Sequence, residues 1–386
     1  MLKCTSVYTC EVDNPEVALA EIKTQLDSKV TLLSHSVGII MCHAEFISSG
    51  VLQYVCENLP FDLAGVTTAS QAVNDEIGDM ILTIFVMTSD DIWFRSGVTE
   101  ALRNDDFDGQ VKDAYEKAAA GVSEPPELAL VFPPFGLHAG DEYVRVWGNI
   151  IPRTPVFGTH AIDDTVSFSE CETIYNGASY KGSMSFVLCY GNIHPRFDIA
   201  TFTEHNAVSS KAYVTKAAGN CVYEINRDVA LKYFEDRGFV ESVKYTPFLI
   251  DLLRRGDYDG VPVIRGHAAF TDEGAAVFYG NVDEGSAFTL IKCDADDTVS
   301  ATCQKVKQIN ELPDVNGVLL FPCVVRRVSL LGINKPLLEL QGIKNTIDPK
   351  IPFMAGYAGG EICPTSVSDG VPTNRFHNHS LVILVV

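Results

Sequence analysis

Blocks of continuous apolar residues alternate along this chain with stretches whose apolar positions recur every three or four residues. In the first half, the continuous blocks predict buried strands, because a strand covered on both faces has no polar side. These strands span residues 36–45, 63–68, 80–87, 128–132, 154–159 and 183–190. The helical period predicts helices that open at Asn14 and Pro15 and that span 48–58, 95–120 (interrupted at 107–109) and 140–149.

The two cycles of the first half repeat the same order: strand, helix, strand with a Gly-Thr turn, and a long apolar strand. FDLAGVTTA (61–69) and TPVFGTHAI (154–162) each have an apolar lead, a Gly and then a Thr. We interpret this as an internal repeat, with Gly65 and Gly158 at matching positions.

The pattern of apolar and polar residues changes at about Lys211. Residues 212–215 and 221–225 predict a hairpin, followed by a short helix at 228–236 and a meander of strands. The remaining elements predicted are strands at 262–270, 275–279, 287–292, 315–321, 353–357 and 381–386, and helices at 294–309 and 335–344. The expected fold is therefore α/β, with mixed sheets covered by helices, in two domains at residues 1–210 and 211–386.

Composition and charge argue against several classes of function. The 386 residues carry a formal net charge of −21. This charge argues against nucleic acid and anionic membrane surfaces as partners, since both attract clustered Lys and Arg. The 11 Cys form no CxxC pair and the N-terminus has no signal-peptide pattern, so we expect a reducing, cytoplasmic environment and no structural metal. The common nucleophile, P-loop and dinucleotide motifs are absent from the sequence, and we expect a protein that is not an enzyme.

Several segments carry a family resemblance. They are FMAGYAGGEICP (353–364), NRFHNHSLV (374–382), LLFPCVVRR (319–327), AGVTTA with MILTIFV (64–69 and 80–86), PVFGTHAIDD (155–164) and KAAGNCVYEINRDVALKYFED (216–236). Together they resemble the FIST N-terminal and C-terminal domains, over nearly all of the chain. The chain departs from that pattern in Tyr357-Ala358-Gly359-Gly360-Glu361 and in the doubled Arg326-Arg327.

The resemblance implies a stand-alone sensory protein of intracellular signal transduction. It implies a small ligand, such as an amino acid, and a signalling partner such as a histidine kinase or a cyclic-dinucleotide enzyme. A homodimer is left open. Some stand-alone members of the family bind haem and sense nitric oxide, so haem is the alternative to a protein without a cofactor.

Two charged residues are the first candidates for ligand contact. Arg326 follows an apolar strand, from whose end a guanidinium can fork onto a carboxylate. Glu361 follows a Gly-Gly turn and can accept from an amine, so the two would make the opposed pair that a zwitterion needs. The competing interpretation is that both form structural ion pairs.

Further candidates surround this pair. The family segments add Cys323, Tyr357 and Asn378, and the two Gly-Thr turns add Thr67, Thr68, Thr159 and His160. The competing interpretation of the turn residues is local turn chemistry. For the haem alternative the proximal ligand would be His43 or His267, each in an apolar stretch, although most such histidines are core residues. A second alternative is a hydrolase with Cys323 as nucleophile, although a buried, inert thiol is the simpler interpretation.

Overall fold

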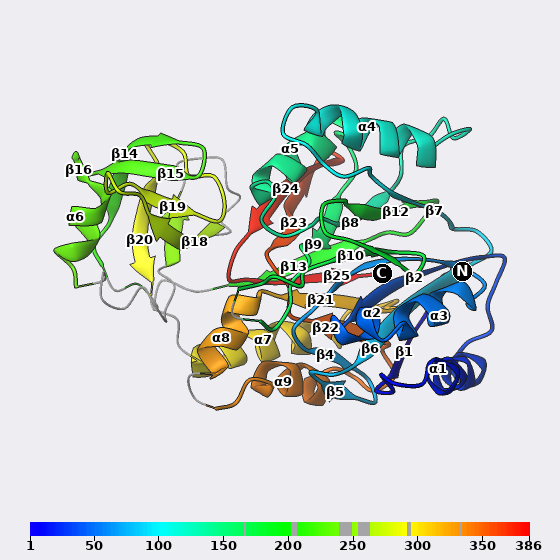
Figure 1. The fold of residues 1–386 in the computed structure, drawn as a ribbon. Coiled ribbons are helices and arrows are strands. Elements are labelled where there is room, and N and C mark those ends of the chain that lie inside the picture. The colour runs from blue at the N-terminus through cyan, green and yellow to red at the C-terminus, as the bar shows by residue number, and fades with distance from the viewer. Residues whose placement is uncertain are drawn as a thin grey trace.

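The computed structural model of the chain describes residues 1–165, 167–201, 207, 209–238, 249–253, 263–291, 295–331 and 334–386. The strands of the described residues form four sheets, and helices cover them, which confirms the expected α/β class with mixed sheets. Figure 1 shows a large body on the right that contains both termini and a smaller sheet on the left.

Three six-stranded sheets of the large body share one strand order. The first unit comprises β1 (Lys3–Thr9), α1 (Pro15–Lys29), β2 (His35–Cys42), α2 (Glu45–Ser48), α3 (Val51–Glu57), β3 (Asp62–Thr67), β4 (Gln71–Val73), β5 (Ile77–Gly78) and β6 (Leu82–Ser89). The second comprises β7 (Trp93–Val98), α4 (Phe107–Ala118), β8 (Leu128–Phe132), α5 (Gly140–Ile150), β9 (Val156–Thr159), β10 (Thr173–Tyr175), β11 (Ala178–Tyr180) and β12 (Ser185–Tyr190). The third comprises β13 (Arg196–Ala200), α7 (Ala295–Ile309), β21 (Val318–Pro322), α8 (Val324–Leu331), α9 (Leu338–Thr346), β22 (Phe353–Gly356), β23 (Glu361–Ser368), β24 (Val371–His377) and β25 (Leu381–Val385).

Each unit is built on a pair of parallel strands separated by helix: β2–β3, β8–β9 and β21–β22. A long antiparallel strand flanks each pair, and an outer strand completes that side of the sheet. The other side is completed by a hairpin from a different unit. Hairpin β4–β5 pairs with β22, β10–β11 pairs with β3, and β23–β24 pairs with β9. The three units are therefore interlocked in a ring, and none can complete its sheet alone.

The internal repeat is confirmed, and it has a third copy. The backbone N–H groups of Thr68, Ala161 and Ala358 donate to carbonyls at or just after the end of the parallel partner strand, at 2.9 Å in each unit. The two glycines of the repeated motif are required by this close pairing. An added Cβ would lie 1.7 Å from a backbone oxygen at Gly65 and 1.8 Å from one at Gly158. The third copy has Ala355 at the matching position, which hides it from a comparison based on Gly-Thr.

The smaller sheet in Figure 1 is an insertion into the third unit. It comprises β14 (Ala212–Ala218), β15 (Cys221–Ile225), β16 (Asp228–Val229), α6 (Ala230–Glu235), β17 (Leu249–Leu253), β18 (Val263–Phe270), β19 (Ala276–Phe278) and β20 (Ala287–Ile291). Strand β14 pairs with both β20 and β15, so the sheet closes on itself around its own apolar core. The chain enters the insertion after β13 and returns at α7, so strands after residue 211 share sheets with strands before it.

Two expectations about local structure are wrong. Residues 95–98, expected to begin a helix, belong to strand β7, which pairs with β12, and the helix begins only at Phe107. Strand β7 is a half-buried edge strand, so its residues give no clean alternation. Arg326 does not follow a strand directly, because the chain turns into helix α8 at Val324.

The main core lies between the three sheets, where Phe157 of the second unit stacks on Phe321 of the third with ring centroids 5.1 Å apart. No helix in the described part of the chain combines the length and the apolar composition that a membrane crossing requires.

Candidate functional site

A small cavity of about 50 Å³ lies where the inserted sheet meets the second and third units. Its walls come from the connections that follow β8, β9, β21 and β22, from helix α8, from the turn between β24 and β25, and from β18 and the residue after β19. The lining residues are Phe135, Phe168, Gly266, Tyr279, Cys323, Val324, Val325, Val328, Gly359, Asn378 and His379. Ligands in α/β proteins commonly bind at the carboxyl ends of parallel strands, and this cavity has that position.

The inserted sheet is fastened to the ring beside this cavity by a buried arginine. Arg265 of β18 is 2% exposed and donates to Asp141 of α5 at 2.9 Å and to the Phe376 carbonyl at 3.0 Å. The other Asp141 oxygen accepts from the Asn281 backbone N–H at 2.7 Å. Because Asp141 binds two segments of the inserted sheet, it fixes how that sheet sits on the ring.

Asn378 makes a second link. Its side-chain oxygen accepts from the Gly266 backbone N–H at 3.3 Å, and its amide group donates to the His377 carbonyl at 3.2 Å. Asn378 therefore lies both in the cavity wall and in the contact between the two bodies.

A buried carboxyl group lies behind the cavity wall. Glu361 is fully buried, and neither carboxylate oxygen receives a hydrogen bond of good geometry from the residues that the structure describes. Burial raises the pKa of Glu361 well above its usual range; the nearby Cys323 thiol, the charge of Arg326 and the Ser380 and Gly360 backbone oppose this only in part. Burial, with Glu361 beside it, likewise raises the pKa of Cys323. Burial therefore favours the neutral form of both groups, and a thiol of this kind is a poor nucleophile.

Arg326 lies in a separate buried network. It is 1% exposed and donates from Nη2 and Nε to Glu339 of α9, at 2.6 Å and 3.0 Å. It also donates to Thr302 at 2.8 Å, and Tyr357 completes the network by donating to Glu339 at 3.1 Å. The pairing of Arg326 with Glu339 is the structural ion pair that was the competing interpretation. Ligand contact by Arg326 and Tyr357 stays a prediction.

The residues of the two Gly-Thr turns lie where the units meet. Thr159 donates to the Gly360 carbonyl at 3.1 Å, and His160 donates to the same oxygen from its backbone at 3.1 Å. Burial lowers the pKa of His160 to about 4. Thr67 binds the backbone of Glu172 at 2.9 Å. These contacts hold units together, and any contact of these residues with a ligand stays a prediction.

Thr68 is also buried. It accepts a hydrogen bond from Gln71 at 2.5 Å, the residue with which strand β4 begins. Its side chain supports the start of the exchanged hairpin, and its contact with a ligand stays a prediction as well.

Family models match most of the chain. The FIST N domain matches residues 36–228 and the FIST C domain matches residues 228–364.

The chain belongs to the FIST family.

FIST domains are associated with sensory signal transduction and with small-ligand binding. The two matches meet at residue 228, inside the inserted sheet, so they do not follow the three units of the ring. A search of curated protein sequences returns no significant match.

The two histidines considered for haem in this FIST protein lie in different sheets. His43 follows β2, and its Nε2 lies 3.2 Å from a carboxylate oxygen of Asp164 near the surface. His267 of β18 is buried, and its ring centroid lies 4.3 Å from that of Phe270 and 5.6 Å from that of Phe278. As these side chains stand, a haem at His267 would have to displace both phenyl rings. The haem alternative stays a prediction.

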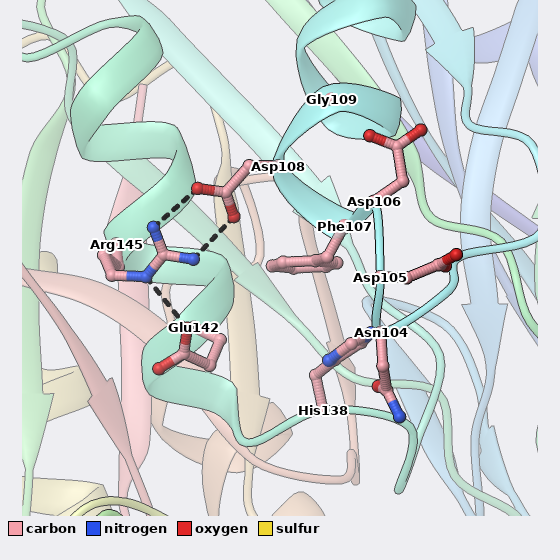
Figure 2. Close-up of a pocket in the computed structure, with 9 residues that line it drawn as sticks. All are labelled: Asn104, Asp105, Asp106, Phe107, Asp108, Gly109, His138, Glu142 and Arg145. Carbon is pink, nitrogen blue, oxygen red and sulfur yellow. Dashed lines mark hydrogen bonds and ion pairs between the residues drawn. The ribbon is translucent and has the colours of Figure 1, made fainter.

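A more open hollow of about 300 Å³ lies between α4 and α5. Figure 2 shows Arg145 of α5 reaching across to Asp108, with bonds of 2.6 Å and 2.8 Å, and back to Glu142 at 2.8 Å. His138 packs on the Phe107 ring at 4.1 Å. These charged side chains are paired with one another, so the hollow is a weaker candidate for ligand binding than the smaller, more enclosed cavity.

Sequence reasoning missed the aromatic wall of the cavity and the Arg265–Asp141 link. Phe135, Phe168 and Tyr279 lie in three connections far apart in the sequence, and nothing local marks them. Arg265 did leave a signal, because a charged residue interrupts the apolar strand VPVIRGHAAF (261–270).

Proposed function

We propose that this FIST protein is a sensor that binds a small, amino-acid-like molecule in the cavity between its inserted sheet and its ring. The carrying observation is that residues of both bodies line one cavity, including Gly266 and Tyr279 on one side and Cys323 and Asn378 on the other. A ligand there touches both bodies and therefore favours the arrangement in which they are closed on each other.

The output would be the position of the inserted sheet. Asp141 and Asn378 bind that sheet next to the cavity, so a shift of the cavity walls changes these links directly. A partner that contacts both bodies would distinguish the bound from the free population. A histidine kinase or a cyclic-dinucleotide enzyme is the class of partner proposed.

The test is a thermal-shift and calorimetric screen of amino acids, small amines and small acids. Val328→Phe narrows the cavity, because Val328 lines it. Val367→Phe is the matched control, because Val367 is an exposed valine on hairpin β23–β24. We expect a compound that stabilises the wild type and the control and that binds Val328→Phe at least about tenfold more weakly.

Hydrogen exchange supplies the second measurement. The bound protein should exchange more slowly in residues 263–279, which form the cavity side of the inserted sheet. Equal binding by wild type and Val328→Phe, or a ligand that leaves exchange in this segment unchanged, would remove the proposal.

A further inference from the structure

We infer that the ligand is a small organic cation, whose ammonium group lies among Phe135, Phe168 and Tyr279 with the Glu361 carboxyl behind Cys323 as its counter-charge. This inference rests on the proposed function, because it assigns a chemical class to the ligand of the same cavity.

The first support is the aromatic wall. The Phe135 ring is centred 5.5 Å from that of Phe168 at an interplanar angle of 67°, and 6.5 Å from that of Tyr279 at 40°. The three rings therefore line the cavity at different orientations to one another, and they come from three separate connections. The negative face of an aromatic ring attracts a cation, and several rings around one space are suited to an alkylammonium group.

The second support is the sign of the charges around the cavity. Among the described lining residues, His379 is the only one that can become a cation, and burial with Arg326 nearby lowers its pKa well below the usual range. Arg326 itself is neutralised by Glu339 at 2.6 Å. An anionic ligand would therefore meet no positive side chain in this wall. A cation would have the Glu361 carboxyl group nearby, separated from it by the Cys323 side chain.

The third support is the state of Glu361. A fully buried carboxyl without a well-formed hydrogen bond to the described residues is costly unless it is neutral or gains a partner. The Cys323 thiol, which lines the cavity, lies against it. A cation held at Cys323 would stabilise the ionised form of Glu361, and the carboxyl proton would pass to solvent.

The titratable groups around Glu361 do not themselves supply the positive charge that would stabilise its ionised form. Strand β9 contributes Thr159 and, beyond it, His160, and strand β24 contributes His377. Burial lowers the pKa of both histidines, to about 4 and about 3 respectively. From α8 and the β24–β25 turn, Arg326 and His379 approach, of which the first is paired and the second is neutral. Among these groups, Glu361 is therefore the one expected to lose a proton when a cation binds in the cavity.

The experiment compares methylammonium with methanol, which have two heavy atoms each and nearly the same shape, and which are small enough for a cavity of about 50 Å³. Binding to the wild-type full chain is measured by calorimetry at about pH 6 and about pH 8, where an alkylamine stays protonated. We expect methylammonium to bind at least about tenfold more tightly than methanol, to release a proton and to bind more tightly at the higher pH.

Substitutions at Glu361 and Tyr279 test which side chains are responsible for cation binding and proton release. Glu361→Gln keeps the shape of the neutral acid and should fold; it should abolish the proton release and the pH dependence. Tyr279→Leu should weaken the binding of methylammonium about two- to thirtyfold, whereas Tyr279→Phe, which keeps the ring, should bind like the wild type.

The outcomes separate the two proposals. Equal binding of methanol and methylammonium, both lost in Val328→Phe, would overturn the inference of a cationic ligand and leave the proposed sensor function standing. No binding of methylammonium, alongside a different screened compound that Val328→Phe rejects, would do the same. If Val328→Phe rejects no compound that binds the wild type, the proposed function fails as well.

Discussion

Replacing Arg326 by Met should destabilise the folded protein even when no ligand is present. Arg326 is 1% exposed and Glu339 is 0% exposed, and their closest atoms lie 2.6 Å apart. Met keeps the apolar stem of Arg326 but leaves the Glu339 carboxylate buried without its cation. Breaking a buried pair by removing one partner costs about 3–5 kcal/mol in free energy of unfolding. For a folding unit of about 300 residues this corresponds to a fall in Tm of roughly 5–8 °C.

Urea denaturation of four proteins measures this effect: wild type, Arg326→Met, Glu339→Gln and the double variant. Each single variant should lower the free energy of unfolding, and the double variant should be more stable than the sum of the two losses predicts, because neither charge is then left alone. Arg145→Met is the control, because Arg145 is a half-exposed arginine whose ion pairs contribute about 1 kcal/mol or less.

Unchanged stability of Arg326→Met would indicate that Arg326 binds ligand. If Arg326→Met unfolds at the same urea concentration as the wild type but no longer binds a small acid, Arg326 is an anchor for ligand and the structural role argued from Glu339 is wrong. A loss of stability without any effect of ligand would support the structural role.

Three further predictions follow from single contacts. Asp141→Asn should loosen the inserted sheet, because Arg265 would keep its burial but lose its counter-charge, and hydrogen exchange should rise in residues 263–282 while the ring is unaffected. Gly158→Ala should prevent stable folding or lower Tm strongly, because its Cβ would lie 1.8 Å from a backbone oxygen; Gly148→Ala in helix α5, with nothing within 4 Å, should be neutral or stabilising. His160, with its folded-state pKa lowered to about 4, should cause stability to fall as pH drops from about 6.5 toward 4, by up to about 3 kcal/mol, and His160→Gln should flatten this slope in urea titrations; an unchanged slope would contradict the burial argument.

The sequence by itself determined the features that depend on neighbours along the chain. Apolar blocks located β2, β3, β6, β8, β12 and β21 within a few residues, because continuous burial on both faces leaves a local pattern. Gly65 and Gly158 made the first two copies of the repeat visible in the sequence, because at these two positions an added Cβ would clash with the backbone of the neighbouring parallel strand. The FIST motifs gave the family for the same reason, since they are contiguous segments.

Only the tertiary structure decided which elements complete one another. Short hairpins such as β4–β5 and β10–β11 carry little local signal, yet each completes the sheet of another unit. The partner of Arg326 proved to be Glu339 of α9, because docking of that helix, rather than spacing in the sequence, determines which carboxylate the guanidinium meets. The cavity itself joins connections from about residue 135 to residue 379. Periodicity reports that a face is buried, but it carries no information about which distant element covers it, and that is why the aromatic wall and the Arg265–Asp141 link appear only in the folded chain.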